Sequence, residues 1–135
     1  MTEFDPYTLM HNPTRANAAF WEACDQGRLV TPKCEACGHR HFPPQPTCPH
    51  CQHRVWTWAP CSGRATLYSY SVIHRPPVPG LRTPFVFASV DLEEGVSLFT
   101  NIIGVDESDL ALGMELKVVF HRLDKGGALP FFTAD

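Results

Sequence analysis

The chain has 135 residues, of which 44% are hydrophobic and 19% charged, so we expect it to fold as one domain or two very small ones. Its 11 basic and 14 acidic side chains give a net charge of −3, which argues against binding nucleic acid mainly through phosphates. The sequence has no run of about 18 apolar residues that would predict a transmembrane helix. The acidic start MTEFDPYTLM predicts no secretory signal, and we expect a soluble, cytoplasmic protein that binds neither nucleic acid nor membrane.

The N-terminal part, residues 1–27, is predicted to be an arm followed by one helix. Residues 1–13 show no periodic pattern. The helix is expected to start after Thr14, a favoured N-cap residue type, and to end at Gly27, where a left-handed residue can close it. Its apolar stripe is formed by Ala16, Ala19, Phe20 and Ala23, with Trp21 and Cys24 beside it. A face this wide must pack on this chain or on another, so Phe20 and Trp21 are candidate partner-binding residues.

The next stretch, residues 28–60, has a different composition. It holds four of the six cysteines, four of the seven histidines and six prolines, but few hydrophobic residues. Such a segment cannot build a core of its own, and it needs another source of stability.

From Gly63 onward, the sequence predicts short β-strands. Runs of β-branched and aromatic residues cover residues 65–73, 85–92, 96–100, 115–122 and 129–132. Turn signals separate them, at 93–95 and 124–127, and residues 106–112 are expected to form one helical turn. A proline-rich excursion, residues 74–83, interrupts the pattern after the first strand. About five strands at hairpin spacing predict a small β-barrel.

Two C-x-x-C pairs, Cys34–Cys37 and Cys48–Cys51, predict a metal site. Two residues between cysteines let the backbone wrap so that both thiolates face one zinc ion, and Gly38 is placed for the positive φ that such a knuckle needs. A closed four-thiolate site leaves no position for substrate, so we expect a structural Zn²⁺. Iron in place of zinc stays open, and disulfides or a histidine ligand are the less favoured alternatives.

The remaining candidate residues are scattered. Cys24 and Cys61 are expected to be a small apolar residue on the helix and a residue at the junction with the barrel. No serine, cysteine or histidine has an evident catalytic partner, so no catalytic residue is predicted. The proline-rich loop offers His74, Arg75, Arg82 and Phe85 as candidate ligand- or partner-binding residues, because loops that leave a barrel often bind.

The order of these motifs resembles the DUF35 family. The motifs are Gly27-Arg-Leu-Val, Cys34-Glu-Ala-Cys37-Gly38, Phe42-Pro-Pro44, Cys48-Pro-His-Cys51, Ser62-Gly63, Tyr68-Ser-Tyr70, residues 90–95 and Leu112-Gly-Met114. The resemblance spans roughly residues 16–132. It implies a mainly β protein with an N-terminal helix (1–27), a rubredoxin-like zinc ribbon (28–60) and a five-stranded OB-fold barrel (61–135).

The resemblance also implies a function that composition and spacing do not reach. Members of this family are partner subunits of thiolase-superfamily proteins, including thiolases, acyltransferases and lipid-transfer-protein-like aldolases that shorten steroid side chains. Some are fused or bound to MaoC-like acyl-CoA hydratases. The chain is therefore expected to be a non-catalytic accessory subunit of an acyl-CoA enzyme, in an α2β2 assembly, with acyl-CoA bound at or near the shared interface.

Alternatives remain open at this point. Val78, Leu81 and Phe85 in the proline-rich loop suit a bulky apolar acyl group, which favours a retro-aldolase that acts on steroid side-chain acyl-CoA. Claisen-type thiolase or acyltransferase chemistry is the second context. Other classes are a module that binds single-stranded nucleic acid and a free-standing acyl-CoA-binding protein. The wide helix face and the arm count against the free-standing protein, because both suggest a surface that another chain covers.

Overall fold

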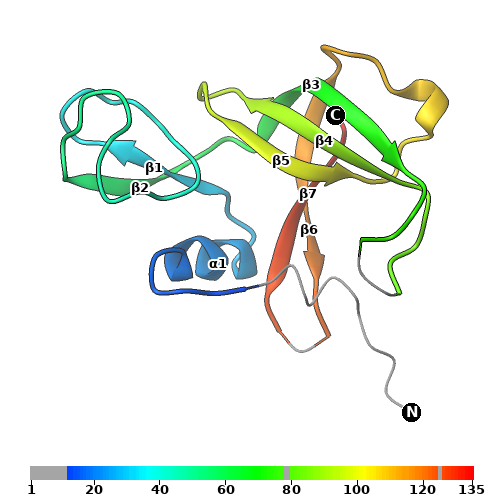
Figure 1. Ribbon diagram of the computed structural model, residues 1–135, viewed down its shortest axis with the longest axis horizontal. Coiled ribbons are helices and arrows are strands. Elements are labelled where there is room, and N and C mark those ends of the chain that lie inside the picture. The colour runs from blue at the N-terminus through cyan, green and yellow to red at the C-terminus, as the bar shows by residue number, and fades with distance from the viewer. Residues whose placement is uncertain (1–11, 78–79, 125) are drawn as a thin grey trace.

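The computed structural model describes residues 12–77, 80–124 and 126–135, and it confirms a mainly β fold. One helix, α1 (Ala18–Asp25), precedes a two-stranded ribbon and a closed five-stranded barrel. In Figure 1 the ribbon lies to one side of the barrel, and α1 lies below the ribbon and beside the barrel. Most of the predicted arm, residues 1–11, lies outside the described residues. Within the described residues, no helix is long and apolar enough to cross a membrane.

The helix differs from its prediction at its start and on its buried face. It begins at Ala18, because Thr14 and Asn17 form a turn before it: the N–H of Thr14 donates to Asn17 Oδ1 at 2.6 Å, and the N–H of Asn17 donates to Thr14 Oγ1 at 3.3 Å. The predicted C-terminus is confirmed, since Gly27 has φ +75° and the N–H of Arg28 closes the helix on Ala23 O at 2.8 Å.

The predicted stripe is partly wrong. Ala16 and Ala19 are exposed, and the buried face is Phe20, Ala23 and Cys24. Alanine side chains are small and gain little from burial, so they do not decide which way the helix faces. This face contacts β1, β6 and β7 of the same chain, so the helix does not need a second chain to cover it.

The ribbon contains two strands that the sequence analysis did not predict. Strands β1 (Val30–Cys34) and β2 (Trp56–Pro60) pair antiparallel, with Val30 opposite Pro60 and Cys34 opposite Trp56. Between them, the chain makes two loops, each of which carries one C-x-x-C pair. The two strands bring these loops to the same end of the ribbon.

The barrel has the strand order β3-β4-β5-β7-β6. The strands are β3 (Arg64–Ile73), β4 (Phe85–Leu92), β5 (Ser97–Ile102), β6 (Glu115–Arg122) and β7 (Ala128–Ala134), and a short 3₁₀ helix, η2 (Glu107–Asp109), lies between β5 and β6. All five lie where the sequence predicted them, to within a few residues. A parallel pairing of Ile102 with Phe132 closes the barrel between β5 and β7.

Inward and outward side chains alternate on the barrel strands. In β4, Val86, Ala88, Val90 and Leu92 are buried, and their neighbours are more exposed. Gly63 lets β3 start close to β6, because a Cβ atom there would lie 2.7 Å from Val118 Cγ1. The barrel core continues into α1 and the ribbon through Phe20, Leu29 and Val30, so the described chain has one main core.

Arg40 joins the two strands of the ribbon to each other and to Cys61, the first residue after β2. Its Nη1 donates to Thr31 Oγ1 at 3.1 Å, Ala59 O at 3.2 Å and Cys61 Sγ at 3.3 Å, and its Nη2 donates to Pro60 O at 3.1 Å. The planar guanidinium fork satisfies two consecutive carbonyls that are not part of the barrel.

We expect Arg40→Met and Arg40→Lys both to lower the free energy of unfolding of the zinc-loaded chain by about 1–2 kcal/mol. Lysine keeps the charge but cannot reach four acceptors with one planar group, so charge alone does not rescue the fold. Urea unfolding followed by circular dichroism measures the effect. Arg54→Lys, at an exposed position of the same ribbon, is the matched control and stays within about 0.5 kcal/mol of wild type. A stable Arg40→Lys variant would contradict this role of the Arg40 guanidinium.

Candidate metal centre and apolar groove

The structure brings Cys34, Cys37, Cys48 and Cys51 to one point. Their sulfur atoms all lie within 4.8 Å of one another, with 3.5 Å between Cys34 and Cys51 and 3.7 Å between Cys37 and Cys48. A zinc ion bound tetrahedrally at about 2.3 Å from each sulfur would place the sulfurs about 3.8 Å apart. A disulfide would place two of them about 2.05 Å apart. The spacing fits a four-thiolate metal site and no disulfide.

Both pairs use the same backbone turn. The residue after each second cysteine is left-handed: Gly38 has φ +75° and Gln52 has φ +68°. The N–H of Gly38 donates to Cys34 O at 3.0 Å, and the N–H of Gln52 donates to Cys48 O at 2.8 Å. The sequence predicted the left-handed turn at Gly38 but not at Gln52, because glutamine gives no signal for a positive φ.

Backbone hydrogen bonds favour the thiolate at the two buried cysteines. Burial raises the pKa of Cys48, but the N–H groups of Cys51 and His50 and the neighbouring thiols outweigh this and lower it to about 6. The His50 N–H donates to the Cys48 sulfur at 3.4 Å. The N–H of Cys37 is the main cause that lowers the pKa of Cys34. Backbone N–H groups thus shift both thiols toward the thiolate form that binds a metal cation.

The thiolate form of the two exposed cysteines, Cys37 and Cys51, depends more on a bound cation than that of the two buried ones. The N–H of His39 lowers the pKa of Cys37, but burial and the hydrogen bonds to the other sulfurs raise it overall, to about 12. Four thiolates this close repel one another unless a positive ion lies among them. A closed set of four such ligands has no open position for a substrate, so the site suits a structural role.

The histidines around the knuckles are not part of the sulfur cluster. His39 and His50 stack on each other at 5.3 Å between ring centroids, one from each loop. His41 is buried edge-on against Trp56 at 5.7 Å. Burial, followed by the charge of His39, lowers the pKa of His41. The lowered pKa favours the uncharged imidazole, which packs as a core side chain. Among the described residues, the four cysteines are the group that can hold a metal.

The two other cysteines lie at the predicted places. Cys24 is fully buried on the helix, and burial raises its pKa to about 12, so its thiol is inert. Cys61 lies at the junction beside Arg40, and burial is the main cause that raises its pKa. Neither has the lowered pKa of a nucleophile.

An apolar groove of about 450 Å³ lies where helix, ribbon loop and barrel meet. Of the predicted binding residues, Phe20, Trp21 and Phe85 line it. The ribbon contributes Phe42, whose ring lies 5.1 Å from that of Phe20, and β4, β5 and β7 form the remaining wall. Three segments that are far apart in the sequence therefore build one surface.

The other predicted binding residues do not join this groove. His74 and Arg75 are exposed in the connection between β3 and β4. Arg82 lines a separate hollow of about 330 Å³, which it shares with Phe85. Leu81, expected to suit an acyl group, is buried, and Val78 lies outside the described residues.

Sequence reasoning missed the most exposed aromatic residues of the groove. Phe87 of β4 and Phe99 of β5 stack at 5.6 Å with an angle of 21° between their rings, and they are 43% and 77% exposed. The strand alternation contained the signal: Val86, Ala88 and Val90 face inward, so Phe87 must face outward. Large exposed aromatic side chains that cluster on one face indicate a binding surface.

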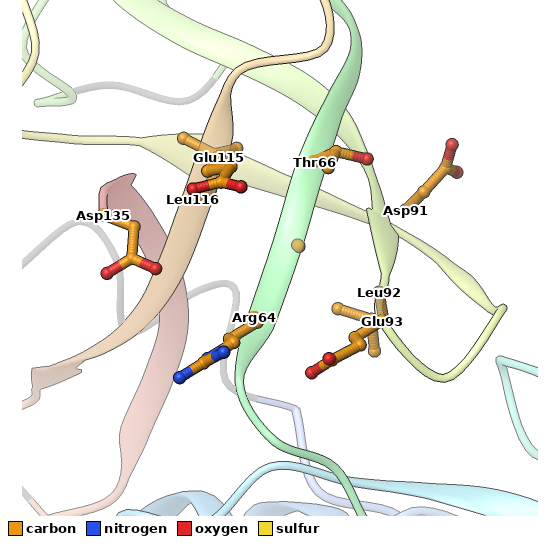
Figure 2. A pocket seen from close by; sticks show the side chains of 9 residues that line it. Arg64, Thr66, Asp91, Leu92, Glu93, Glu115, Leu116 and Asp135 are labelled. Atoms are coloured by element: carbon orange, nitrogen blue, oxygen red, sulfur yellow. The ribbon is translucent and has the colours of Figure 1, made fainter.

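Another hollow, of about 270 Å³, lies on the barrel and is lined by charged residues, but these residues do not form a metal site. Figure 2 shows the carboxylates of Asp91 and Glu93 on one side of β3 and those of Glu115 and Asp135 on the other. Side chains that diverge in this way cannot share one cation. The acidic residues at and before the turn predicted at residues 93–95 form a polar rim: Asp91 accepts from Ser97 Oγ at 2.7 Å, and Glu93 accepts from Ser62 Oγ at 2.8 Å.

Together these features define a class of protein in which a four-cysteine ribbon is joined to an OB-type barrel. Two family models match the chain: "ChsH2, rubredoxin-like zinc ribbon domain" at residues 21–55 and "ChsH2, C-terminal OB-fold domain" at residues 58–121. A "DUF35 domain-containing scaffold protein" from Methanocaldococcus jannaschii is 32% identical over 73% of this chain and 72% of its own length. The chain belongs to the DUF35 family, as its motifs indicated.

A solved structure described as "Ltp2-ChsH2(DUF35) aldolase" has a TM-score of 0.83 and 38% identity, over 90% of this chain and 96% of that one. A "Probable enoyl-CoA hydratase alpha subunit" from Thermomonospora curvata is 38% identical over 97% of this chain. A "3-oxo-4,17-pregnadiene-20-carboxyl-CoA hydratase alpha subunit" from Mycobacterium tuberculosis is 33% identical over 87% of it. This chain spans only 42% and 38% of the lengths of these two relatives.

One further relative carries the name of a different reaction. It is a "Benzoylsuccinyl-CoA thiolase subunit BbsA" from Thauera aromatica, which is 32% identical over 60% of this chain and 60% of its own length. The similar proteins thus carry names of a hydratase, an aldolase and a thiolase.

Removal of the metal is expected to unfold the ribbon and to be visible in tryptophan fluorescence. All three tryptophans, Trp21, Trp56 and Trp58, belong to the helix or the ribbon and none to the barrel. We expect a chelator, or acidification that protonates the thiolates, to shift their emission to longer wavelength, and one equivalent of zinc at neutral pH to reverse the shift.

Two variants make this test specific. Cys48→Ser is expected to give the shifted spectrum without chelator and to bind no zinc, because one ligand is lost. Cys61→Ser, outside the cluster, retains the metal and the native spectrum. An unchanged emission spectrum in metal-free Cys48→Ser would contradict a structural role for the site.

Proposed function

We propose that this chain is a zinc-bound, non-catalytic accessory subunit of a thiolase-superfamily acyl-CoA enzyme. The observation that carries the proposal is the likeness to the Ltp2-ChsH2(DUF35) aldolase structure, which extends over nearly the whole of both chains. The scaffold-protein name of the archaeal relative supports a non-catalytic role. The metal site supports it too, since its four ligands stabilise the ribbon and leave no position for a substrate.

The partner we propose is a lipid-transfer-protein-like retro-aldolase that acts on steroid side-chain acyl-CoA. Two names support this choice: the aldolase of the structural neighbour and the pregnadiene-carboxyl-CoA of the mycobacterial relative. The complex would be an α2β2 hetero-tetramer, with acyl-CoA at or near the shared interface. His74, Arg75 and Arg82 are exposed in one loop, where the two arginines can pair with CoA phosphates or with acidic groups of the partner.

A Claisen-type thiolase partner is the second candidate. The specific observation in its favour is the likeness to the benzoylsuccinyl-CoA thiolase subunit. The nucleic-acid alternative has less support, because the groove that holds the exposed aromatic residues is lined by no charged side chain in the described part of the chain. A surface for single strands pairs its aromatic residues with basic ones.

Purification of the tagged chain from its own host, followed by native mass spectrometry, tests the proposed assembly. We expect one zinc per chain and a co-purifying thiolase-like subunit in a two-to-two complex. The zinc-free Cys48→Ser variant is expected to lose the partner, since its ribbon does not fold, and Cys61→Ser keeps it. A zinc-loaded wild-type chain that purifies alone under gentle conditions would contradict the accessory role.

The two reaction types separate in an assay of the co-purified pair. Retro-aldolase activity predicts cleavage of a β-hydroxyacyl thioester with a steroid side chain. Thiolase activity predicts cleavage of β-ketoacyl thioesters in the presence of free CoA. Turnover of short β-ketoacyl thioesters alone would rule out the aldolase and leave the Claisen-type partner.

A further inference from the structure

Among the described residues, the apolar groove contains a buried side-chain amide donor that has no hydrogen-bond acceptor. Asn101 of β5 pairs with Phe87 of β4 and lies two residues after Phe99, so it belongs to the same outer face of the barrel. It lines the groove, although only 6% of it is exposed. Its Nδ2 atom is buried and has no hydrogen-bond acceptor within the described part of the chain.

Two other polar side chains of the groove, Thr100 and Asn17, have hydrogen-bond partners within the chain. The hydroxyl of Thr100 donates to Pro130 O at 3.0 Å, and Asn17 Oδ1 accepts from the N–H of Thr14. An unpaired buried amide donor is costly to the fold, and most buried donors in proteins are paired. A leucine would fill the position of Asn101 without that cost. The unused donor therefore calls for an acceptor that comes from outside the described part of the chain.

The remaining lining defines the chemistry of that acceptor. The groove is formed mainly by aromatic, proline and leucine side chains, and none of its described lining residues is charged. Its volume of about 450 Å³ lies within the usual range of small-molecule sites, which combine apolar walls with a few polar groups. The phosphates of a nucleotide or of CoA have no cationic partner among these residues.

We propose that the groove binds an uncharged, apolar molecule or molecular portion that carries a carbonyl oxygen, and that Asn101 Nδ2 donates a hydrogen bond to this oxygen. The aromatic walls, including Phe20, Phe42 and Phe131, contact its ring or chain, and the stacked Phe87 and Phe99 form the outer rim. The described lining residues all belong to this chain, so binding to the groove can be measured on the chain without a partner subunit.

A matched pair of probes tests the proposal. 9-Fluorenone and fluorene share one planar ring system and differ by a carbonyl oxygen in place of two hydrogens. Their affinities for the zinc-loaded full chain are measured by isothermal titration calorimetry. The ratio of the two affinities is then compared between wild type and Asn101→Leu, because fluorene is also the more apolar compound. We expect the substitution to shift the ratio against fluorenone by about fivefold to tenfold, the value of one hydrogen bond.

Further variants and one spectroscopic measurement make the result decisive. Phe131→Ala is expected to weaken both probes, and Leu112→Ala, an exposed position outside the groove, to weaken neither. In wild type, the infrared carbonyl stretch of bound fluorenone is expected at lower wavenumber than in a hydrocarbon solvent. This measurement decides the question even if Asn101→Leu does not fold.

Three results would overturn the proposal: no binding of either probe, an affinity ratio that Asn101→Leu leaves unchanged, or a carbonyl stretch at its hydrocarbon-solvent value. Absence of probe binding would leave the groove to a protein partner. Each of these outcomes is independent of whether a thiolase-like subunit co-purifies, so the ligand site and the accessory role can fail separately.

Discussion

Four sulfur atoms within 4.8 Å of one another hold together a segment that has too few apolar side chains to fold by itself. Metal binding at such a site can supply on the order of 10 kcal/mol of folding free energy. The consequence reaches beyond the ribbon. Its second strand carries Trp56 and Trp58, and their rings link His41 to Phe20 of the helix. The metal site thus fixes the ribbon side of the main core, and with it the Phe42 wall of the groove.

The barrel supplies the opposite wall and the rigidity that the groove needs. Its closure through Ile102 and Phe132 leaves β5 and β7 adjacent, so that Phe99 and Asn101 line the same groove as Pro130 and Phe131. A closed barrel has no free edge along which these strands could slip. The register of β4 and β5 is therefore fixed. Their outward positions can carry aromatic side chains that stay exposed.

The sequence predicts what depends on local spacing and misses what depends on tertiary contact. Two C-x-x-C pairs, the five barrel strands and the end of the helix at Gly27 follow from residues close together in the chain. The helix face was misjudged, because the tertiary core selects Cys24 over Ala16 and Ala19. The ribbon strands were missed, because Pro32 and the sparse hydrophobic residues hide their pattern.

The groove is the clearest example of a feature that the spacing of residues in the sequence does not predict. Phe20, Phe42, Phe99 and Phe131 come from helix, ribbon loop and two barrel strands, and no periodicity relates them. Phe20 and Phe85 were singled out for separate reasons, one as part of a helix face and one as part of a loop. Only the closed fold shows that they share a surface, and that the unpaired amide of Asn101 lies on it.

One structural unit that recurs under several reaction names must contribute something that those reactions share. The similar proteins are named as parts of a hydratase, an aldolase and a thiolase, and as a scaffold protein. Hydration, retro-aldol cleavage and thiolysis need different catalytic groups, so a common ribbon and barrel cannot supply the groups specific to each. A rigid domain that is stabilised by a metal site and has an uncharged groove can instead hold a partner chain or the apolar part of a substrate. Either task is the same in all three reactions. A shared task of this kind fits the proposed accessory role. In the ligand site proposed above, the groove lining and the Asn101 amide would select which apolar ligand is held.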